Sequence, residues 1–186
     1  MKKFITSITK NDLDSIDMDR FKYINNKEYQ DYFTSPSSIE HYRLLTHISN
    51  NLSNSTLIDV GTLKGSSALA LSTNQTNTVY SFNLSNELEL NSLPTNINFI
   101  IDDILNEKYR TIILESKVIL LDTFHDGTFE KKFHDYLREI GYRGVLLLDD
   151  ITLNNEMIEF WNSIDEDKTD ISYIGHITGT GIVYFN

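Results

Sequence analysis

The sequence predicts an α/β fold: a doubly wound, mainly parallel sheet of seven strands, covered by helices and finished by a C-terminal antiparallel hairpin. From residue 56 onward, short apolar runs alternate with segments of helical periodicity. The apolar runs are continuous, which indicates strands buried on both faces. The chain has 186 residues, of which 40% are hydrophobic and 23% charged, and this composition fits one globular domain.

A helix opens the predicted domain. Pro36 lies near its first turn, a capping box runs from Ser37 to Glu40, and apolar residues from Ile39 to Leu52 recur at helical spacing. The strands expected after it lie at 56–60, 78–82, 96–101, 118–121 and 145–148. The helices expected between and after them lie at 65–72, 85–93, 103–116, 128–140 and 154–164, of which 85–93 is short. A hairpin of strands 171–177 and 182–186 around the Gly-rich turn 178–181 ends the chain.

Residues 1–35 precede this pattern and are polar, with weak periodicity. We therefore expect an N-terminal arm or cap, followed by a single domain at 36–186. The arm is rich in aromatic residues, so a homodimer formed through it is one expectation.

Composition excludes several classes of protein. The net charge is −11 and no basic cluster follows Lys2 and Lys3, so the chain would repel the phosphates of nucleic acids. Cysteine is absent, which excludes disulfides, thiolate metal sites and a cysteine nucleophile. The N-terminus lacks an apolar core and no apolar run could span a bilayer, so we expect a soluble, cytoplasmic protein without a membrane partner.

Acidic side chains and their amides gather at the ends of the predicted strands. The stretch VLLLDD sets two carboxylates directly after a buried strand, where they repel each other unless something holds them. The strand-end residues are Asp59, Asn83, Asp102, Asp103, Asp122, Asp149 and Asp150. In open α/β sheets, ligands bind at this edge. The pattern therefore points to a cation, a cationic ligand, or both.

The turn after the first strand, DVGTLKGSS, contains Gly61 and Gly65, which permit a tight turn and close backbone approach. It matches neither the Walker loop nor the G-x-G-x-x-G dinucleotide motif. It is either a plain strand-to-helix turn or a ligand loop, and the acid-rich edge beside it favours the ligand loop.

Three segments resemble the class I S-adenosylmethionine (SAM)-dependent methyltransferases, in particular small metal-dependent O-methyltransferases of the catechol type and of the macrolide or aminocoumarin sugar type. They are LIDVGTLKGSSALAL, VILLDTFHDGTFEKKFHDYLREIGYRGVLLLDD and HITGTGIVYF. The resemblance implies a Rossmann-like fold. It also implies SAM, Mg²⁺ or another divalent cation as cofactors, and methyl transfer to a hydroxyl of a small-molecule acceptor such as a sugar, polyol or catechol-like compound.

Carried over residue by residue, the resemblance assigns Asp122, Asp149 and Asp150 as metal ligands, with Asp122 also catalytic. Alternatively, Asp149 and Asp150 only cap the turn into the next helix. His125 matches the position of a base that takes the acceptor proton, and its alternative is an exposed loop histidine. We expect structural roles for the remaining histidines, namely His41, His47, His134 and His176.

For the cofactor, the resemblance places Gly61 and its neighbours against the methionine part of SAM, and Asp102 and Asp103 against adenine or as a helix N-cap. The cofactor-binding set is Asp59, Gly61, Thr62, Gly65, Ser67, Asn83, Asp102 and Asp103. Asn83 departs from the pattern, because the family usually has an acid there to accept both ribose hydroxyls.

Two other function classes remain open from the sequence. A protein with this fold that binds a ligand without turnover would explain Asn83. A nicotinamide-dependent oxidoreductase is disfavoured, because the third glycine of the dinucleotide motif and an acid ending the second strand are both missing.

Overall fold

The computed structural model describes residues 2–24, 27–32, 35–36 and 38–186, and its centre is a seven-stranded sheet of order β3-β2-β1-β4-β5-β7-β6. The strands are β1 (Thr56–Val60), β2 (Thr78–Asn83), β3 (Ile97–Ile101), β4 (Ser116–Leu121), β5 (Gly144–Asp149), β6 (Asp167–Asp170) and β7 (Thr180–Phe185). The first five strands are parallel and β7 runs antiparallel to β5 and β6. The predicted fold class is confirmed.

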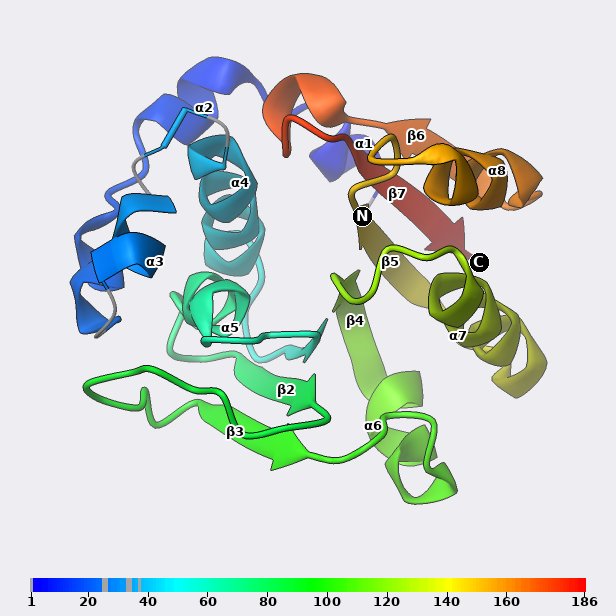
Figure 1. Cartoon of the computed structure of the whole chain (residues 1–186), viewed down its shortest axis with the longest axis horizontal. Helices are drawn as coiled ribbons and strands as arrows, with labels where there is room; N and C mark the ends of the chain where they lie inside the picture. Colours follow the sequence, from blue (N-terminus) through cyan, green and yellow to red (C-terminus); the bar gives the residue numbers. More distant parts are fainter. Residues whose placement is uncertain (1, 25–26, 33–34, 37) are drawn as a thin grey trace.

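Helices cover both faces of the sheet (Figure 1). The helical elements are α1 (Lys2–Ile5), α2 (Lys10–Asp14), η1 (Asp19–Tyr23), α3 (Lys27–Tyr32), α4 (Ile39–Asn50), α5 (Ser66–Leu71), η2 (Glu107–Tyr109), α6 (Arg110–Glu115), α7 (Thr128–Ile140), α8 (Asn155–Ser163) and η3 (Ser172–Ile174). The N-terminal segments, α4 and α5 share one face, while α6, α7 and α8 share the other.

Successive strand residues supply two separate cores, because side chains along a strand point to opposite faces. Leu57 and Leu147 pack with α4, α5 and the N-terminal segments. Ile58 and Leu148 pack with α6, α7 and α8. Burial on both faces explains why these strands are continuously apolar.

The strand order reverses at β1, which pairs with β2 on one side and with β4 on the other. Ligands of doubly wound sheets bind at this switch point, beyond the carboxyl ends of the strands. The β4–β5 register sets Leu121 opposite Leu148, so the next residues, Asp122 and Asp149, emerge from neighbouring strands at this edge.

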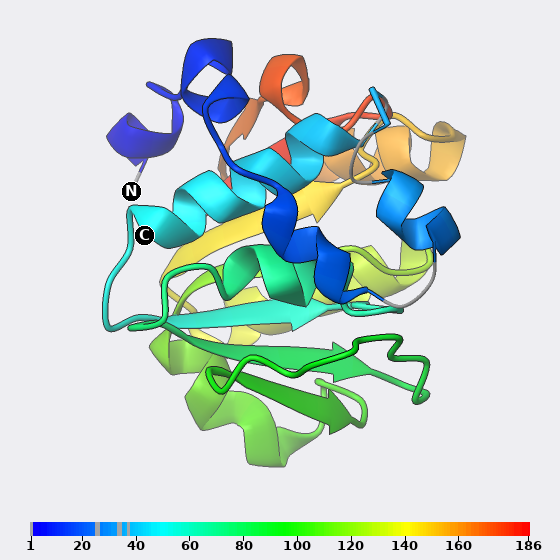
Figure 2. The ribbon, with the colours of Figure 1, turned by 90° about the vertical axis from the view of Figure 1, so that its left-hand side faces the viewer.

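The N-terminal segments pack on the domain. Ile5, Leu13 and Ile24 are fully buried in the core on the α4 side. Figure 2 shows these segments lying with α4 over the same side of the sheet. Among the described residues, no helix combines the length and apolar character that crossing a bilayer requires.

Three predicted elements differ in the structure. The helix expected at 103–116 is shorter and consists of η2 and α6. The helix expected at 85–93 is an irregular segment, because Leu90 bridges to Ile24 and the backbone N–H of Asn91 donates to the carbonyl of Tyr23 (2.7 Å). The N-terminal arm thus forms hydrogen bonds with backbone groups that would bond to one another within a helix.

The hairpin is confirmed, but its first strand is β6 at Asp167–Asp170 and not 171–177. The carboxylate of Asp170 accepts the backbone N–H of Ser172 (2.8 Å), which turns the chain into η3. The expected capping residue Ser37 lies outside the described residues, and α4 has Ser38 at its N-cap.

Candidate functional site

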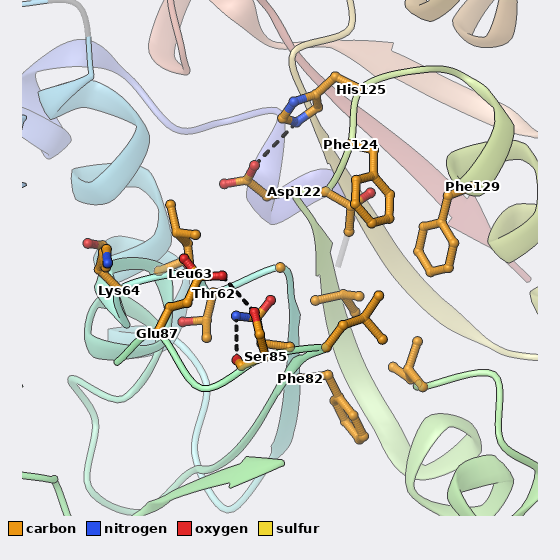
Figure 3. Close-up of a pocket in the computed structure, with 18 of the residues that line it drawn as sticks. Thr62, Leu63, Lys64, Phe82, Ser85, Glu87, Asp122, Phe124, His125 and Phe129 are labelled. Atoms are coloured by element: carbon orange, nitrogen blue, oxygen red, sulfur yellow. Dashed lines mark hydrogen bonds and ion pairs between the residues drawn. The ribbon is translucent and has the colours of Figure 1, made fainter. Parts of the chain in front are cut away.

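A cavity of about 740 Å³ opens at the carboxyl ends of β1 to β4. Its wall comes from the β1–α5 loop, the ends of β2 and β3, the β4–α7 loop, the start of α4, and His176 from the segment before β7. Figure 3 shows Thr62, Leu63 and Lys64 on one side of this cavity and Asp122, Phe124 and His125 on another. The edge of the sheet at which the sequence predicts ligand binding therefore contains a cavity.

Gly61 brings the first loop against the end of β4. Its φ is +97°, and a Cβ there would lie 1.7 Å from the carbonyl oxygen of Asp122. Only glycine tolerates both conditions. Gly65, also at positive φ, precedes α5, and Thr62 and Ser67 line the cavity while Gly65 itself does not.

Asp59 lies behind the cavity wall. It is fully buried, does not line the cavity, and accepts a hydrogen bond from the hydroxyl of Ser81 (2.8 Å). Burial raises the pKa of Asp59 to about 6, although the hydroxyls of Ser67, Ser81 and Thr62 oppose the rise. Asp59 therefore does not face the cavity itself, and the neighbouring Thr62 and Ser67 do.

The ends of β2 and β3 bring Asn83, Asp102 and Asp103 to the cavity. The side-chain amide of Asn83 donates to the carbonyl of Ser85 (2.9 Å). Asp102 pairs with Lys108 and accepts the hydroxyl of Tyr109 (2.9 Å), and these contacts hold its pKa below the usual value. Asp103 accepts the N–H of Leu105 (2.9 Å) in a turn, but the N-cap of η2 is Asn106, so the predicted N-cap role of Asp102 and Asp103 is wrong.

The β4 and β5 ends carry the second half of the site. His125 stands between two of the predicted acids, with Nε2 3.2 Å from Asp122 and Nδ1 3.5 Å from Asp150. Figure 3 shows its ring directed at Asp122. Asp149 and Asp150 do not cap α8, because the side chain of Asn154 does so by accepting the N–H of Met157 (2.8 Å).

Two histidines that the sequence interpretation treated as structural also lie here. His41 of α4 has Nδ1 3.4 Å from Asp149, and His176 has Nδ1 2.9 Å from Asp150 and 3.4 Å from Asp149. We call these two histidines, His125 and the three aspartates the His–Asp cluster. A sequence signal existed for His41, because it lies four residues before buried Leu45 and so shares its helix face.

The comparisons with known proteins bear on the fold of this chain. No protein-family model matches the sequence, and a search of curated proteins finds no match. Solved structures do match. A Corynebacterium glutamicum protein aligns with a TM-score of 0.64 at 15% identity, covering 99% of this chain and 94% of that one. A Podospora anserina methyltransferase, solved with S-adenosylhomocysteine (SAH), aligns at 0.60 with 14% identity, covering 90% and 88%. A candidate caffeoyl-CoA O-methyltransferase from Staphylococcus aureus aligns at 0.63 with 12% identity, covering 86% and 90%. This chain has the methyltransferase fold.

Within this methyltransferase fold, the His–Asp cluster is strongly charged. Burial alone would lower the pKa of His125, but its hydrogen bond to Asp122 and the nearby carboxylate charges raise it to about 9. Burial would likewise lower the pKa of His176, but Asp149 and Asp150 raise it to about 10. Burial and the charge of Asp149 raise the pKa of Asp122. At neutral pH both histidines therefore carry protons.

The backbone is strained at the same place. Among the described residues, four other than glycine have positive φ, and three of them are Leu63 (45°), His125 (55°) and Asp150 (59°). Such strain persists only where the surroundings enforce it, and it is concentrated at functional sites. For His125 the enforcing group is buried Glu130, whose carboxylate accepts the N–H of His125 (2.9 Å) and the hydroxyl of Thr123 (2.8 Å).

Several buried ligand-type atoms in the His–Asp cluster have no hydrogen-bond partner. They are both ring nitrogens of His41 and Oδ1 of Asp149. Ligand atoms of His41, Asp122 and Asp149 lie within 4.8 Å of one another, as do those of His125, Asp149 and Asp150. Asp149 belongs to both groups, so it is the centre of any cation site in the cluster.

Proposed function

We propose that this protein is a SAM-dependent methyltransferase that transfers the methyl group to a hydroxyl of a small molecule with the help of a divalent cation. The observation that carries the proposal is the continuity of the cavity, which runs from the glycine turn after β1 to Asp122, His125 and His176 of the His–Asp cluster. One hollow thus joins a loop suited to a cofactor with a group of residues suited to a cation.

The chain offers contacts along the whole length of SAM. The backbone at Gly61 and the hydroxyls of Thr62 and Ser67 would meet its methionine part. Asp102, with its carboxylate held ionised by Lys108, lies at the far end of the cavity, where adenine would bind. Asn83 would face the ribose with the one acceptor oxygen that an amide has, while one of its two N–H groups is donated to the carbonyl of Ser85. When bound, SAM supplies the methyl group on a positively charged sulfur.

The His–Asp cluster fits a divalent cation. The carboxylates of Asp149 and Asp150 are buried, that of Asp122 is partly exposed to the cavity, and Asp149 keeps an oxygen without a hydrogen-bond partner. Hard divalent cations take such carboxylate oxygens as ligands. Bound there, the cation would lower the pKa of the acceptor hydroxyl. Asp122 and Asp149 would hold it, and Asp150 would complete the carboxylate set.

His125 would take the acceptor proton. Its ring borders the cavity next to Asp122, and Glu130 fixes its backbone. The charges that raise its pKa come from the same carboxylates that would neutralise a cation, so a bound cation favours the neutral, proton-accepting ring. The acceptor would enter beside Phe124, which is 64% exposed at the rim.

Titration calorimetry with SAM and SAH, with and without a divalent cation, tests the cofactor. A second assay follows methyl transfer to sugars, polyols and catechols. We expect SAM binding, and transfer that a chelator stops. The Asp122→Asn variant should lose transfer while keeping its fold, because the substitution relieves repulsion with Asp149. SAM binding without transfer to any acceptor would favour a binding protein without turnover, and the absence of SAM binding would refute the proposal.

A further inference from the structure

His41 is a buried histidine whose ring nitrogens have no hydrogen-bond partner. The residue is only 3% exposed, and neither Nδ1 nor Nε2 of its ring makes a hydrogen bond. Leaving a buried polar group unpaired costs about 1 to 3 kcal/mol. A helix position on an apolar face, shared with Leu45 and Ile48, would be better filled by an apolar residue unless the imidazole has a ligand.

The ring lies next to the unpartnered oxygen of Asp149. His41 Nδ1 is 3.4 Å from Asp149 Oδ1, and this oxygen is itself buried without a hydrogen bond. Asp149 contacts His176 through its other oxygen, Oδ2, at 3.4 Å. Two orphaned ligand atoms therefore lie side by side on elements far apart in the chain, α4 and β5.

Asp122 completes a three-residue group. The ligand atoms of His41, Asp122 and Asp149 all lie within 4.8 Å of one another. Atoms that bind one ion at about 2.1 Å lie roughly 3 to 4 Å apart. Small rotations of the three side chains would thus bring them to coordination distance.

We propose that His41, Asp122 and Asp149 bind one first-row transition-metal dication in preference to Mg²⁺. This inference rests on the proposed function for the cation's purpose, but it adds a nitrogen ligand from α4 and a choice of metal. An imidazole and two carboxylates form a mixed nitrogen and oxygen donor set, which suits Mn²⁺, Fe²⁺, Co²⁺ or Zn²⁺. Mg²⁺ is held almost entirely by oxygen ligands and dehydrates reluctantly.

Because His41 lies on α4, binding of the metal should also change the stability of the protein. α4 follows the N-terminal segments, and its contacts with α2 and α5 connect the site to the arm. Binding a cation through His41 would tie α4 to the ends of β4 and β5. The bound metal should therefore stabilise the whole protein, because its ligands come from both sides of the core.

The test uses the full chain and needs no methyl acceptor. Purified, metal-free protein is titrated calorimetrically with Zn²⁺, Co²⁺ and Mg²⁺ separately, and the visible absorption of Co²⁺ reports a nitrogen ligand. We expect Co²⁺ and Zn²⁺ to bind more tightly than Mg²⁺ and to raise the melting temperature. The His41→Gln variant should lose ~10-fold or more of the Co²⁺ affinity, with a changed spectrum, and nearly none of the Mg²⁺ affinity.

His47→Gln is the matched control, because His47 lies on the same helix but stacks against Phe4, away from the cavity. It should bind Co²⁺ like the wild type. Asp149→Asn serves as a second variant if His41→Gln fails to fold, and it should lose the binding of every cation. Failure of Co²⁺ and Zn²⁺ to bind the wild type, or unchanged Co²⁺ binding by a folded His41→Gln, would overturn the inference. SAM binding and methyl transfer by a protein that binds Co²⁺ and Zn²⁺ no more tightly than Mg²⁺ would overturn the inference and leave the proposed function standing. Tighter binding of Co²⁺ and Zn²⁺ without any SAM binding would do the reverse.

Discussion

Asp59 makes the stability of this protein depend on pH in a direction opposite to that of most carboxylates. The side chain is fully buried behind the cavity wall, and burial raises its pKa from 3.8 to about 6. The unfolded chain ionises this group freely, whereas the folded chain resists ionisation. Between these two pKa values the folded state binds more protons than the unfolded state, so the free energy of unfolding falls as the pH rises.

The size of this effect follows from the pKa difference. Each pKa unit corresponds to about 1.4 kcal/mol, so ionised Asp59 lowers the free energy of unfolding by about 3 kcal/mol at pH 7. At pH values below 3.8 the contribution disappears, because the carboxyl is protonated in both states. The Asp59→Asn variant retains an oxygen that can accept the hydroxyl of Ser81. We therefore expect it to be more stable than the wild type at pH 7, by up to about 3 kcal/mol, and little different at pH 4.

Urea unfolding of both proteins at intervals from pH 4 to pH 8, followed by the fluorescence of Trp161, measures the difference. The gap between the two proteins should open as the pH rises from 4 to the folded-state pKa of about 6, and should then stay constant up to pH 8. Asp135→Asn is a control for the loss of an exposed carboxylate, because Asp135 lies on the surface beside Lys131, which holds the pKa of Asp135 low. Its profile should stay close to that of the wild type. Parallel profiles for wild type and Asp59→Asn would refute the assignment of a buried, reluctantly ionised carboxyl.

Substitutions at Gly61, Glu130 and Asn83 probe the cavity and the residues that support it. Gly61→Ala should destabilise the protein by about 3 kcal/mol or more in urea unfolding, because its Cβ would overlap a backbone oxygen. Gly141→Ala, where no atom lies within 4 Å of a new Cβ, should cost only about 1 to 2 kcal/mol, and equal costs would contradict the close approach. Glu130→Ala should slow methyl transfer without changing SAM affinity, because the backbone of His125 loses the carboxylate that accepts its N–H. Glu130→Gln keeps an acceptor oxygen and should retain most activity. Equal loss of activity in both variants would count against a positioning role for Glu130. Asn83→Asp should strengthen SAM binding in calorimetry, because a carboxylate can accept both ribose hydroxyls, and weaker binding would argue that this position does not face the ribose.

The sequence predicted most of the fold because burial on both faces leaves a plain mark on a strand. The run Val145–Leu148 is apolar throughout since alternate residues enter different cores. β6 escaped prediction for the opposite reason. Its residues, Asp167–Asp170, form an edge strand with exposed and half-buried side chains, so the run DKTD carries no apolar signal.

The false helix at 85–93 shows the limit of local patterns. Leucine and glutamate, which dominate its centre, have high helix propensity, but the segment lies against the N-terminal arm and bonds to it at Leu90 and Asn91. A contact between segments more than sixty residues apart in the chain has no local signal.

Part of the candidate site was also within reach of the sequence. Parallel strands place their carboxyl ends at one edge, which is enough to predict that Asp122 and Asp149 emerge together. The histidine neighbours were not predictable in this way. His41 contacts Asp149 because α4 packs over the sheet with its first turn near the carboxyl end of β5. His176 contacts Asp150 because the segment between η3 and β7 lies beside the end of β5.

A crystal structure grown with SAH and MnCl₂ tests the central claim most directly, because manganese can be located by its anomalous scattering. We predict SAH in the cavity, with its sulfur between Gly61 and the His–Asp cluster, and a manganese peak bound by Asp122 and Asp149. A cavity without SAH, or carboxylates paired with His125 and His176 and no manganese peak between them, would contradict the account.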